Sequence, residues 1–338
     1  MTTAGTPASL DVVGIGNALV DVLSHETDGF VEAHGLVRGA MSLIDADRAE
    51  HLYDAMGPAI EISGGSAANT MVGVASLGGA AAFVGRVRDD QLGEVFAHDI
   101  RAAGVRFETP PARDGLSSGR CLIVVTPDAE RTLNTFLGAA AEIGPDDVTA
   151  HLIDAAQVTY LEGYLFDQPS AKEAFRHAAR LAHEAGRRVA LTLSDGFCVD
   201  RHRDDFRALV EHEVDVLFAN ESEICSLYEV DGFDDALQNV LHHCEIAALT
   251  RSAKGSVIVS GDDVHVIDAH PVDDAVVDTT GAGDLYAAGF LYGLTHGYDL
   301  GRCGRLGALA AAEVISHLGA RPEVTLSELA MPLLSGER

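Results

Sequence analysis

The chain has 338 residues, of which 47% are hydrophobic, and its formal net charge is −29. Such a negative charge excludes electrostatic binding to a nucleic-acid backbone or to an anionic membrane, because both are themselves negatively charged. No apolar run approaches a membrane span, and no basic stretch precedes an apolar core near the N-terminus, so we expect no membrane helix and no secretory signal. The five cysteines are scattered, without a Cys-x-x-Cys pair, which predicts a reduced, cytoplasmic protein without a disulfide framework.

The first predicted elements combine a buried strand with glycine turns. Leu10 to Gly16 reads as a strand that ends in glycines. Gly64-Gly65-Ser66 then opens a helix of small residues, and a second strand follows at about 80–85. Two other segments, about 17–44 and 107–137, contain short β-like stretches and lack a long helical period.

From Asp146 onward, predicted helices and strands alternate, which indicates a parallel sheet covered by helices on both faces. Ser170 and Glu173 form a predicted capping box for a helix that Gly186 closes. We expect the two β-rich segments to form a small lid over the carboxyl edge of the sheet, within a single domain, 1–338. The other predicted helices lie at about 146–156, 203–211, 221–229, 234–243, 283–296, 299–317 and 325–335, and the strands at 158–162, 188–193, 214–218, 246–250, 256–260 and 264–268.

The most informative motif is Asp278-Thr279-Thr280-Gly281-Ala282-Gly283-Asp284. Its small residues open an apolar helix, and a helix N-terminus exposes backbone N–H groups and the positive end of the dipole. This arrangement suits a phosphoryl group in transfer. A carboxylate in the first turn can accept the proton of an attacking hydroxyl, which is the role predicted for Asp284. A glycine turn with an Asp that caps the helix is the structural alternative, and these residues alone do not separate the two.

Other nucleotide-binding signatures fail. The sequence contains no Gly-Lys dipeptide, so it has no Walker P-loop. The stretch from Gly14 to Leu19 begins like a dinucleotide fingerprint, but Leu19 replaces the third glycine and no helical pattern follows. These absences argue against a nicotinamide dehydrogenase.

A second glycine turn and the end of the first strand predict a site for a polar acceptor. Gly65 would allow close backbone approach, and Asn69 would project an amide one turn into the helix. Asn17 and Asp21 follow the first strand, and an aspartate can accept hydrogen bonds from two adjacent hydroxyls. Tight helix packing and ordinary turns are the structural alternatives for these residues.

The two motifs Gly-Gly-Ser-x-x-Asn and Asp-Thr-Thr-Gly-Ala-Gly-Asp, in this order, resemble those of the PfkB carbohydrate kinase family, which includes ribokinase and adenosine kinase. The resemblance covers about residues 10–325. It implies a ribokinase-like, three-layer α/β/α fold with a mostly parallel central sheet and a small β lid. It also implies transfer of the γ-phosphate of ATP to a hydroxyl, with Asp284 as the base.

Within this family, three segments are most similar to adenosine kinases: Gly16 to Asp21, Leu191 to Phe197, and Leu217 to Glu223. The last contains an Asn-x-x-Glu tetrad, by which Asn220 and Glu223 would organise Mg²⁺ through waters. An N-capped helix is the structural alternative for the tetrad.

The resemblance implies further roles. Arg131 would contact the transferring phosphate, for which a guanidinium is suited. The catalytic group would be Asp284 with Gly281, Ala282, Gly283 and Arg131. The acceptor site would comprise Asn17, Asp21, Gly64, Gly65, Ser66 and Asn69, with Ile44, Cys121, Leu133 and Leu165 around a base. The ATP side would comprise Asn220, Thr250, Lys254, Gly255, Thr280, Gly281 and Gly283. A monovalent cation, K⁺, would bind at Asp278, Thr280, Ser316 and Gly319.

The acceptor implied first is the ribose 5′-hydroxyl of adenosine, which would give AMP. Two departures leave other acceptors open: Thr280 stands where animal adenosine kinases have Asn, and several pocket positions lack a stacking aromatic. The alternatives are a sugar kinase of the same family, acting on ribose, fructose or a deoxy sugar acid, and a non-catalytic nucleotide-binding regulator. The family also contains both monomers and homodimers, and its partners are small molecules.

Overall fold

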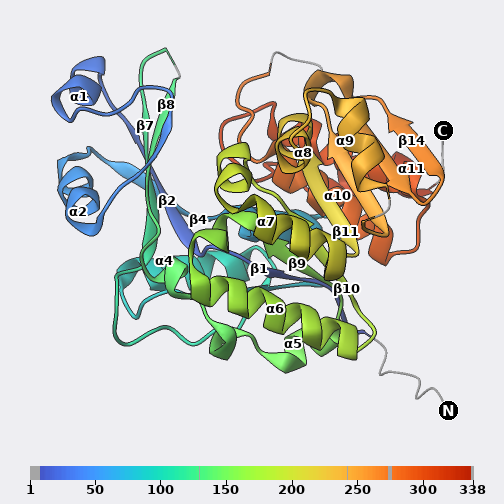
Figure 1. The fold of residues 1–338 in the computed structure, drawn as a ribbon. Helices are drawn as coiled ribbons and strands as arrows, with labels where there is room; N and C mark the ends of the chain where they lie inside the picture. The colour runs from blue at the N-terminus through green and yellow to red at the C-terminus, as the bar shows by residue number, and fades with distance from the viewer. Residues whose placement is uncertain (1–7, 129, 242, 273–275, 336–338) are drawn as a thin grey trace.

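The fold is organised around a nine-stranded sheet (Figure 1). The computed structural model describes residues 8–128, 130–241, 243–272 and 276–335. All neighbouring strands are parallel except for β12–β13 and β13–β14, which are antiparallel. The predicted mostly parallel sheet is therefore confirmed. In spatial order the strands are β14 (Asp263–Ile267), β13 (Ser256–Ser260), β12 (Ile246–Thr250), β11 (Val216–Asn220), β10 (Arg188–Thr192), β9 (Ala156–Glu162), β1 (Leu10–Ile15), β5 (Ala81–Val84) and β6 (Arg106–Phe107).

Helices cover both faces of this sheet, which is why its central strands are apolar on both sides. In β1, Val12 packs into the core on one face, whereas Val13 and Ile15 pack into the core on the other. The first core contains α3 (Ser66–Ser76), α4 (Gln91–Ala102), α10 (Ala282–Thr295), α11 (Leu300–Val314) and α12 (Leu326–Leu329). The second contains α5 (Ala150–Ala155), α6 (Pro169–Glu184), α7 (Gly196–His212), α8 (Glu221–Tyr228) and α9 (Phe233–Val240).

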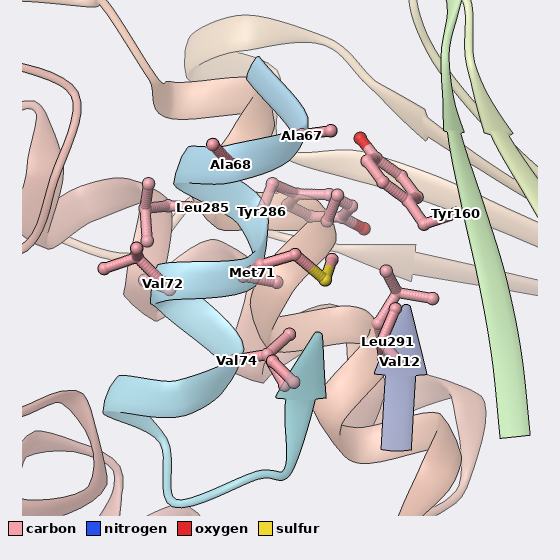
Figure 2. Packing of buried hydrophobic residues seen from close by; sticks show 14 of the residues in the cluster. Val12, Ala67, Ala68, Met71, Val72, Val74, Tyr160, Leu285, Tyr286 and Leu291 are labelled. Atoms are coloured by element: carbon pink, nitrogen blue, oxygen red, sulfur yellow. The ribbon is translucent and has the colours of Figure 1, made fainter. Parts of the chain in front are cut away.

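The contact between α3 and α10 positions the two predicted motifs. Figure 2 shows Met71 of α3 between Val12 of β1 and Leu285 and Tyr286 of α10. A side chain at Gly73 would lie 2.6 Å from the Cβ of Ala288 and 2.7 Å from Leu285, so the two helices approach more closely than larger residues would allow. Their N-termini consequently open beside one another.

A second, five-stranded sheet stands beside the main body, with α1 (Asp28–Ala33) and α2 (Ala46–Ala55) on its outer side (Figure 1). It contains strands from both segments of the predicted lid. It also contains β4, which lies outside those segments, although the alternation from Ala59 to Ser63 is a signal for a strand. We keep the name lid for this sheet. Its strands are, in spatial order, β3 (Met41–Leu43), β8 (Arg131–Phe136), β7 (Gly119–Val125), β2 (Leu19–His25) and β4 (Ala59–Gly64).

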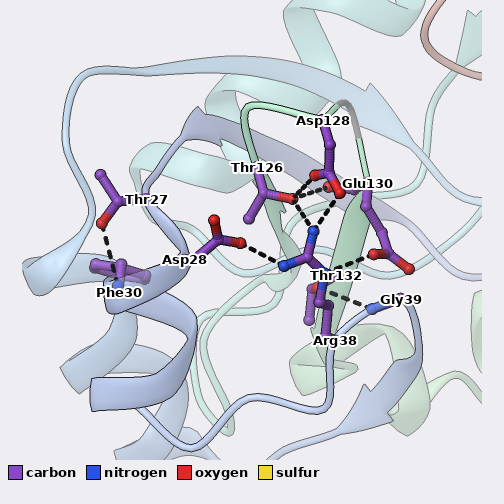
Figure 3. A network of polar contacts seen from close by, with 9 residues as sticks. All are labelled: Thr27, Asp28, Phe30, Arg38, Gly39, Thr126, Asp128, Glu130 and Thr132. Atoms are coloured by element: carbon purple, nitrogen blue, oxygen red, sulfur yellow. Dashed lines mark hydrogen bonds and ion pairs between the residues drawn. The ribbon is translucent and has the colours of Figure 1, made fainter.

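Arg38 joins two parts of the lid that are far apart along the chain. Its guanidinium donates to Asp28 at the start of α1, to Asp128 in the turn between β7 and β8, and to Glu130 at 2.6 Å (Figure 3). Thr126 also accepts from it, at 3.4 Å. One cation therefore holds α1 against the hairpin that carries Arg131.

Several local predictions require correction. The Ser170–Glu173 capping box is wrong, because α6 begins at Pro169, so Ser170 already lies inside the helix. The helix predicted at 146–156 is a 3₁₀ turn (Pro145–Asp147) followed by α5. The helix predicted at 203–211 is the second part of α7, which is kinked at His202 (φ −127°, ψ 26°), and the part from Gly196 to the kink was not predicted. The last predicted helix consists of α12 and a separate α13 (Met331–Ser335). None of the helices in the described ranges is long and apolar enough to cross a membrane.

The close packing of α10 on α11 gives a test of this core. An added Cβ at Gly289 would lie 2.4 Å from the carbonyl oxygen of Leu306, so we expect Gly289→Ala to lower the free energy of unfolding by about 1–3 kcal/mol, measured by urea denaturation. Gly29→Ala in α1 is the control, because the nearest atom there is 3.6 Å away and alanine favours a helix. Equal stability of both variants would contradict this packing.

Candidate active site

A cavity of about 1250 Å³ lies between the carboxyl edge of the central sheet and the lid. Its wall is formed by the ends of β9, β10, β11 and β12, the N-termini of α3 and α10, and the lid strands β2, β3, β7 and β8. Many residues that the sequence singled out meet there. They are Asn17, Asp21, Gly65, Ser66, Asn69, Cys121, Arg131, Leu133, Asn220, Glu223, Thr250, Gly255, Thr280, Gly281, Ala282, Gly283 and Asp284.

Asp284 lies in the first turn of α10 and is held from α3. Ser66 Oγ donates to one carboxylate oxygen at 2.5 Å, and Asn69 Nδ2 donates to the other at 3.2 Å. Burial raises the pKa of Asp284 to about 6, against the two hydrogen bonds, which lower it. Asp284 is thus a fixed carboxylate that is ionised at neutral pH and is a stronger base than an exposed aspartate.

The backbone N–H groups at the start of α10, from Gly281 to Asp284, form a cradle for an anion, and this cradle depends on the conformation of Gly281. This residue has a φ of 80°, and a Cβ there would lie 2.7 Å from Ala320, so a side chain is excluded on two grounds. The N–H of Ala282 turns back to Thr279 O at 3.3 Å. The next N–H groups, of Gly283 and Asp284, belong to the first turn of α10 and have no partner within the helix itself. These two groups can bind an anion in the cavity.

Glu162, at the end of β9, holds Asn17 and the start of α3 in place, and the sequence analysis missed it. One of its oxygens accepts from Asn17 Nδ2 at 2.6 Å and from Asn17 N at 3.3 Å, and the other accepts from Ala67 N at 2.8 Å. The carboxylate therefore fixes both Asn17 and the start of α3. Asn17 Oδ1 is buried and has no hydrogen-bond partner among the described residues, so it is available to a hydroxyl on a ligand.

Asp21 enters the cavity from β2 of the lid. Burial raises its pKa to about 6, while the positive charges of Arg321 and Arg131 lower it. A Cβ at Gly64 would lie 2.4 Å from the Asp21 carboxylate, so the missing side chain leaves room for this carboxylate. Gly64 itself is not on the cavity wall. Gly65 has a φ of 99°, and a Cβ there would lie 2.1 Å from Asn17 O. The glycine pair thus lets the Asn17 and Asp21 segments approach the start of α3.

Arg131, on β8 of the lid, forms an ion pair with Asp278. The Asp278 carboxylate also accepts from Thr280 N at 3.0 Å, from Thr280 Oγ1 at 2.6 Å and from Gly319 N at 3.1 Å. The predicted K⁺ ligand is therefore occupied by protein donors, and Ser316 Oγ donates to Glu313 O at 2.7 Å. The ion pair brings the guanidinium next to the cradle that begins at Gly281.

The Asn220–Glu223 tetrad caps α8. Asn220 Oδ1 accepts from Glu223 N at 2.9 Å, and the Glu223 carboxylate accepts from Asn220 N at 2.9 Å and from Asn220 Nδ2 at 2.6 Å. Burial and, to a lesser extent, the charge of Asp195 raise the pKa of Glu223 to about 7, against the hydrogen bond from Asn220 N, which lowers it. No group of three His, Cys, Asp or Glu side chains in the described ranges could hold a metal by itself. A carboxylate on the cavity wall without a cationic partner fits a hydrated Mg²⁺ that completes its shell with phosphate oxygens and water.

Besides Gly64, three further residues predicted for the acceptor and ATP sites lie off the cavity wall. Leu165 is 2% exposed and packs in the core beneath α6, contrary to its expected place at a base. The reason is the 3₁₀ turn Gly163–Asp167, in which adjacent side chains diverge, so that Tyr164 faces the cavity instead. Lys254 is directed to Glu221, at 3.5 Å, with its side chain 66% exposed. Ile44 packs against the core that contains α3.

The comparisons with known proteins agree with this geometry. The model of the pfkB family carbohydrate kinases matches residues 58–326, and the chain belongs to this family. It is accordingly an ATP-dependent phosphotransferase that acts on a hydroxyl. The crystal structure of adenosine kinase from Sinorhizobium meliloti is 53% identical, covers 96% of this chain and 99% of that one, and superposes with a TM-score of 0.88.

Two further relatives have names that point to different acceptors, one a probable sugar kinase and the other an adenosine kinase. A probable sugar kinase protein from Rhizobium etli CFN 42 is 51% identical, with a TM-score of 0.89 over 97% of this chain and 99% of that one. The adenosine kinase of Saccharomyces cerevisiae is 28% identical over 91% of this chain and 95% of its own length. The ribokinase-like fold predicted from the motifs is thereby confirmed, and the adenosine kinases and sugar kinases together leave the acceptor to be decided on the site.

The buried Glu162 predicts a pH-dependent stability. Burial raises its pKa from 4.5 to about 7, so between these values the folded protein holds a proton that the unfolded chain has released. The contribution of Glu162 to stability therefore falls as the pH rises. Glu162→Gln cannot ionise, and relative to the unchanged protein its free energy of unfolding should rise by up to about 3 kcal/mol between about pH 5 and pH 8. Exposed Glu50→Gln is the control; parallel curves for the Glu162 variant would contradict the assignment.

Proposed function

We propose that this protein transfers the γ-phosphate of ATP to the 5′-hydroxyl of adenosine and so produces AMP. The observation that carries the proposal is the position of Asp284, which lies between an anion-binding helix N-terminus and a polar acceptor site. The acceptor site consists of Asp21, Asn17 with its free Oδ1, and the turn at Gly65. The 53% identity to an adenosine kinase over nearly the whole chain supports the nucleoside as acceptor.

The ribose diol matches the acceptor groups. The Asp21 carboxylate can accept from two neighbouring hydroxyls, and Asn17 Oδ1 can accept from another donor. Asn17 is buried and Asp21 is partly buried, so a ligand hydroxyl replaces water that the free protein would otherwise need there. A ribose held in this way directs its remaining hydroxyl, the 5′ one, toward Asp284 on the opposite side of the glycine turn.

The nucleobase has an apolar surface available. Cys121 and Leu133 of the lid line the cavity, and so do Tyr164 and Phe197. Phe197 is 78% exposed and lines the cavity, so its ring is accessible to a ligand there. An aromatic ring offers stacking to a purine, and a free sugar has no comparable flat apolar face.

The transfer step uses groups already in place. Asp284 accepts the 5′-hydroxyl proton as the oxygen forms a bond to the γ-phosphorus, and the bond from that phosphorus to the leaving ADP oxygen breaks. The N–H groups at the start of α10 and the Arg131 guanidinium stabilise the charge on the transferring group. Thr250, Gly255 and Thr280 line the nucleotide side, and Asn220 and Glu223 would hold Mg²⁺, which neutralises phosphate charge. Closure of the lid would exclude water from the reaction.

Asp284→Asn should lower kcat by about 10³-fold or more, because an amide cannot accept the proton. Thermal unfolding should be unchanged or shifted upward, since the substitution removes a partly buried charge whose hydrogen-bond partners among the described residues are Ser66 and Asn69. In the unchanged protein, kcat/KM for the acceptor should rise with pH through about 6 as Asp284 loses its proton. Exposed Asp54→Asn is the control, and near-normal turnover of Asp284→Asn would exclude it as the base.

The acceptor itself is tested by measuring ADP release with adenosine, inosine, ribose and fructose under the same conditions. We expect the highest kcat/KM with adenosine. The alternative, a sugar kinase, is favoured by the 51% identity to a probable sugar kinase, and a preference for ribose or fructose would establish it instead. Tyr164→Ala and Phe197→Ala should raise KM for adenosine and leave KM for ATP unchanged if these rings contact the base.

A further inference from the structure

Arg321 is a buried cation that reaches the active site from the loop after α11. Its Nε donates to Asn69 Oδ1 at 3.3 Å, and its Nη1 contacts Asp99 Oδ2 at 3.2 Å. Its Nη2 is buried and has no hydrogen-bond partner among the described residues. Its side chain is 16% exposed, whereas most arginines of this chain that form ion pairs are more exposed. A guanidinium in such a position must be explained, because burying it is costly.

The contact with Asn69 fixes the orientation of an amide. The Oδ1 of Asn69 accepts from Arg321, so its Nδ2 is directed at the Asp284 carboxylate, to which it donates at 3.2 Å. Without Arg321, the amide can rotate and present its oxygen to a carboxylate, which would repel it. Arg321 therefore determines which end of Asn69 faces the base.

The contact with Asp99 anchors Arg321. Asp99 Oδ2 also accepts from Ser63 N at 2.9 Å and from Ser63 Oγ at 2.6 Å. Ser63 belongs to β4 and immediately precedes the glycine turn at Gly64 and Gly65. The same carboxylate thus joins α4, the lid and the C-terminal loop, and keeps the guanidinium at a fixed distance from α3.

Arg321 also supplies charge to Asp21. Burial raises the pKa of Asp21, and Arg321 is the group that opposes this most strongly, ahead of Arg131, while Asp284 acts in the same direction as burial. Arg131 is already paired with Asp278. Arg321 therefore favours the charged form of Asp21 more strongly than Arg131 does.

We propose that Arg321 is a positioning residue for the phosphoryl acceptor site: anchored on Asp99, it orients the Asn69 amide toward Asp284. The inference rests on the proposed function, in which Asp21 binds the acceptor and Asp284 is the base. A structural tie between the C-terminal loop and α4 is the competing explanation. It accounts for the Asp99 contact, but it leaves unexplained why the guanidinium extends beyond Asp99 to Asn69.

The proposal predicts a change in pH dependence. Asp21 faces Arg321, Arg131, Asp284 and Cys121, and Asp284 faces Ser66, Asn69, Asp21, Glu162, Tyr160 and Tyr164. Removing Arg321 takes away a cation near Asp21 and frees the amide that donates to Asp284. Both changes raise a pKa that is already about 6. The fall of kcat/KM for the acceptor on the acid side of its pH profile, called the acid limb below, should therefore move to higher pH.

The experiment compares Arg321→Met, which keeps the apolar length, with Arg321→Lys, which keeps the charge. We expect Arg321→Met to raise KM for the acceptor about tenfold or more, to move the acid limb upward by about one pH unit, and to leave KM for ATP unchanged. Arg321→Lys should restore much of the acid limb, because the charge remains, but less of KM, because an ammonium cannot contact Asn69 and Asp99 as a fork. Arg188→Met, at an ion pair with Glu245 on the surface, is the matched control.

The outcomes separate the two explanations. A lower Tm of Arg321→Met with unchanged acceptor KM and unchanged acid limb would assign Arg321 a structural tie and overturn the proposal. If Arg321→Met does not fold, Arg321→Lys decides: a raised acceptor KM supports positioning, and unchanged kinetics overturn it. The measurement uses whichever acceptor of the panel is phosphorylated, and Asp284→Asn tests the base on that acceptor. A wrong acceptor or a wrong base is thereby distinguished from a wrong role for Arg321.

Discussion

The active site depends on the close approach of two helix N-termini at the end of β1. Ser66 and Asn69 can reach Asp284 only because α3 and α10 pack with Gly73 against Leu285 and Ala288. The small residues of α3 are therefore a condition of the chemistry as well as of the packing. A larger residue at Gly73 would separate the helices and lengthen the hydrogen bonds that hold the base, although it lies two turns away from it.

This approach concentrates negative charge in a poorly solvated place. Burial raises the pKa of each of four carboxyl groups on the cavity wall, to about 6 or 7. Such groups destabilise the free protein near neutral pH, and they gain from ligands that bring hydroxyl donors or cations. A diol and a hydrated Mg²⁺ are ligands of this kind, so binding of either should raise the stability of the folded protein. These four groups are Asp21, Glu162, Glu223 and Asp284.

The sequence predicted the parts of this site that are local in the chain. Asp284 and its glycines were found because a helix start with small residues is a contiguous pattern. Glu162 and Arg321 were missed because each is a single charged residue whose partners, Asn17 and Asn69, are far away along the chain. Leu165 was assigned to the base pocket by the resemblance alone, which did not show that neighbouring side chains diverge in a 3₁₀ turn and that Tyr164 faces the cavity instead.

In the proposed reaction the lid would contribute to both the acceptor side and the phosphate side, and this constrains how it can move. Asp21 of β2 lies on the acceptor side, whereas Arg131 of β8 lies beside the cradle, and the register of β2, β7 and β8 links the two strands within one sheet. A shift of the lid that brings Asp21 to a diol must also move Arg131. In the free protein Arg131 is paired with Asp278, and a phosphate at the start of α10 would offer it a second anion nearby. Because one hydrogen-bonded sheet carries both residues, acceptor binding and phosphate binding should favour the same position of the lid, and each ligand should then strengthen the binding of the other.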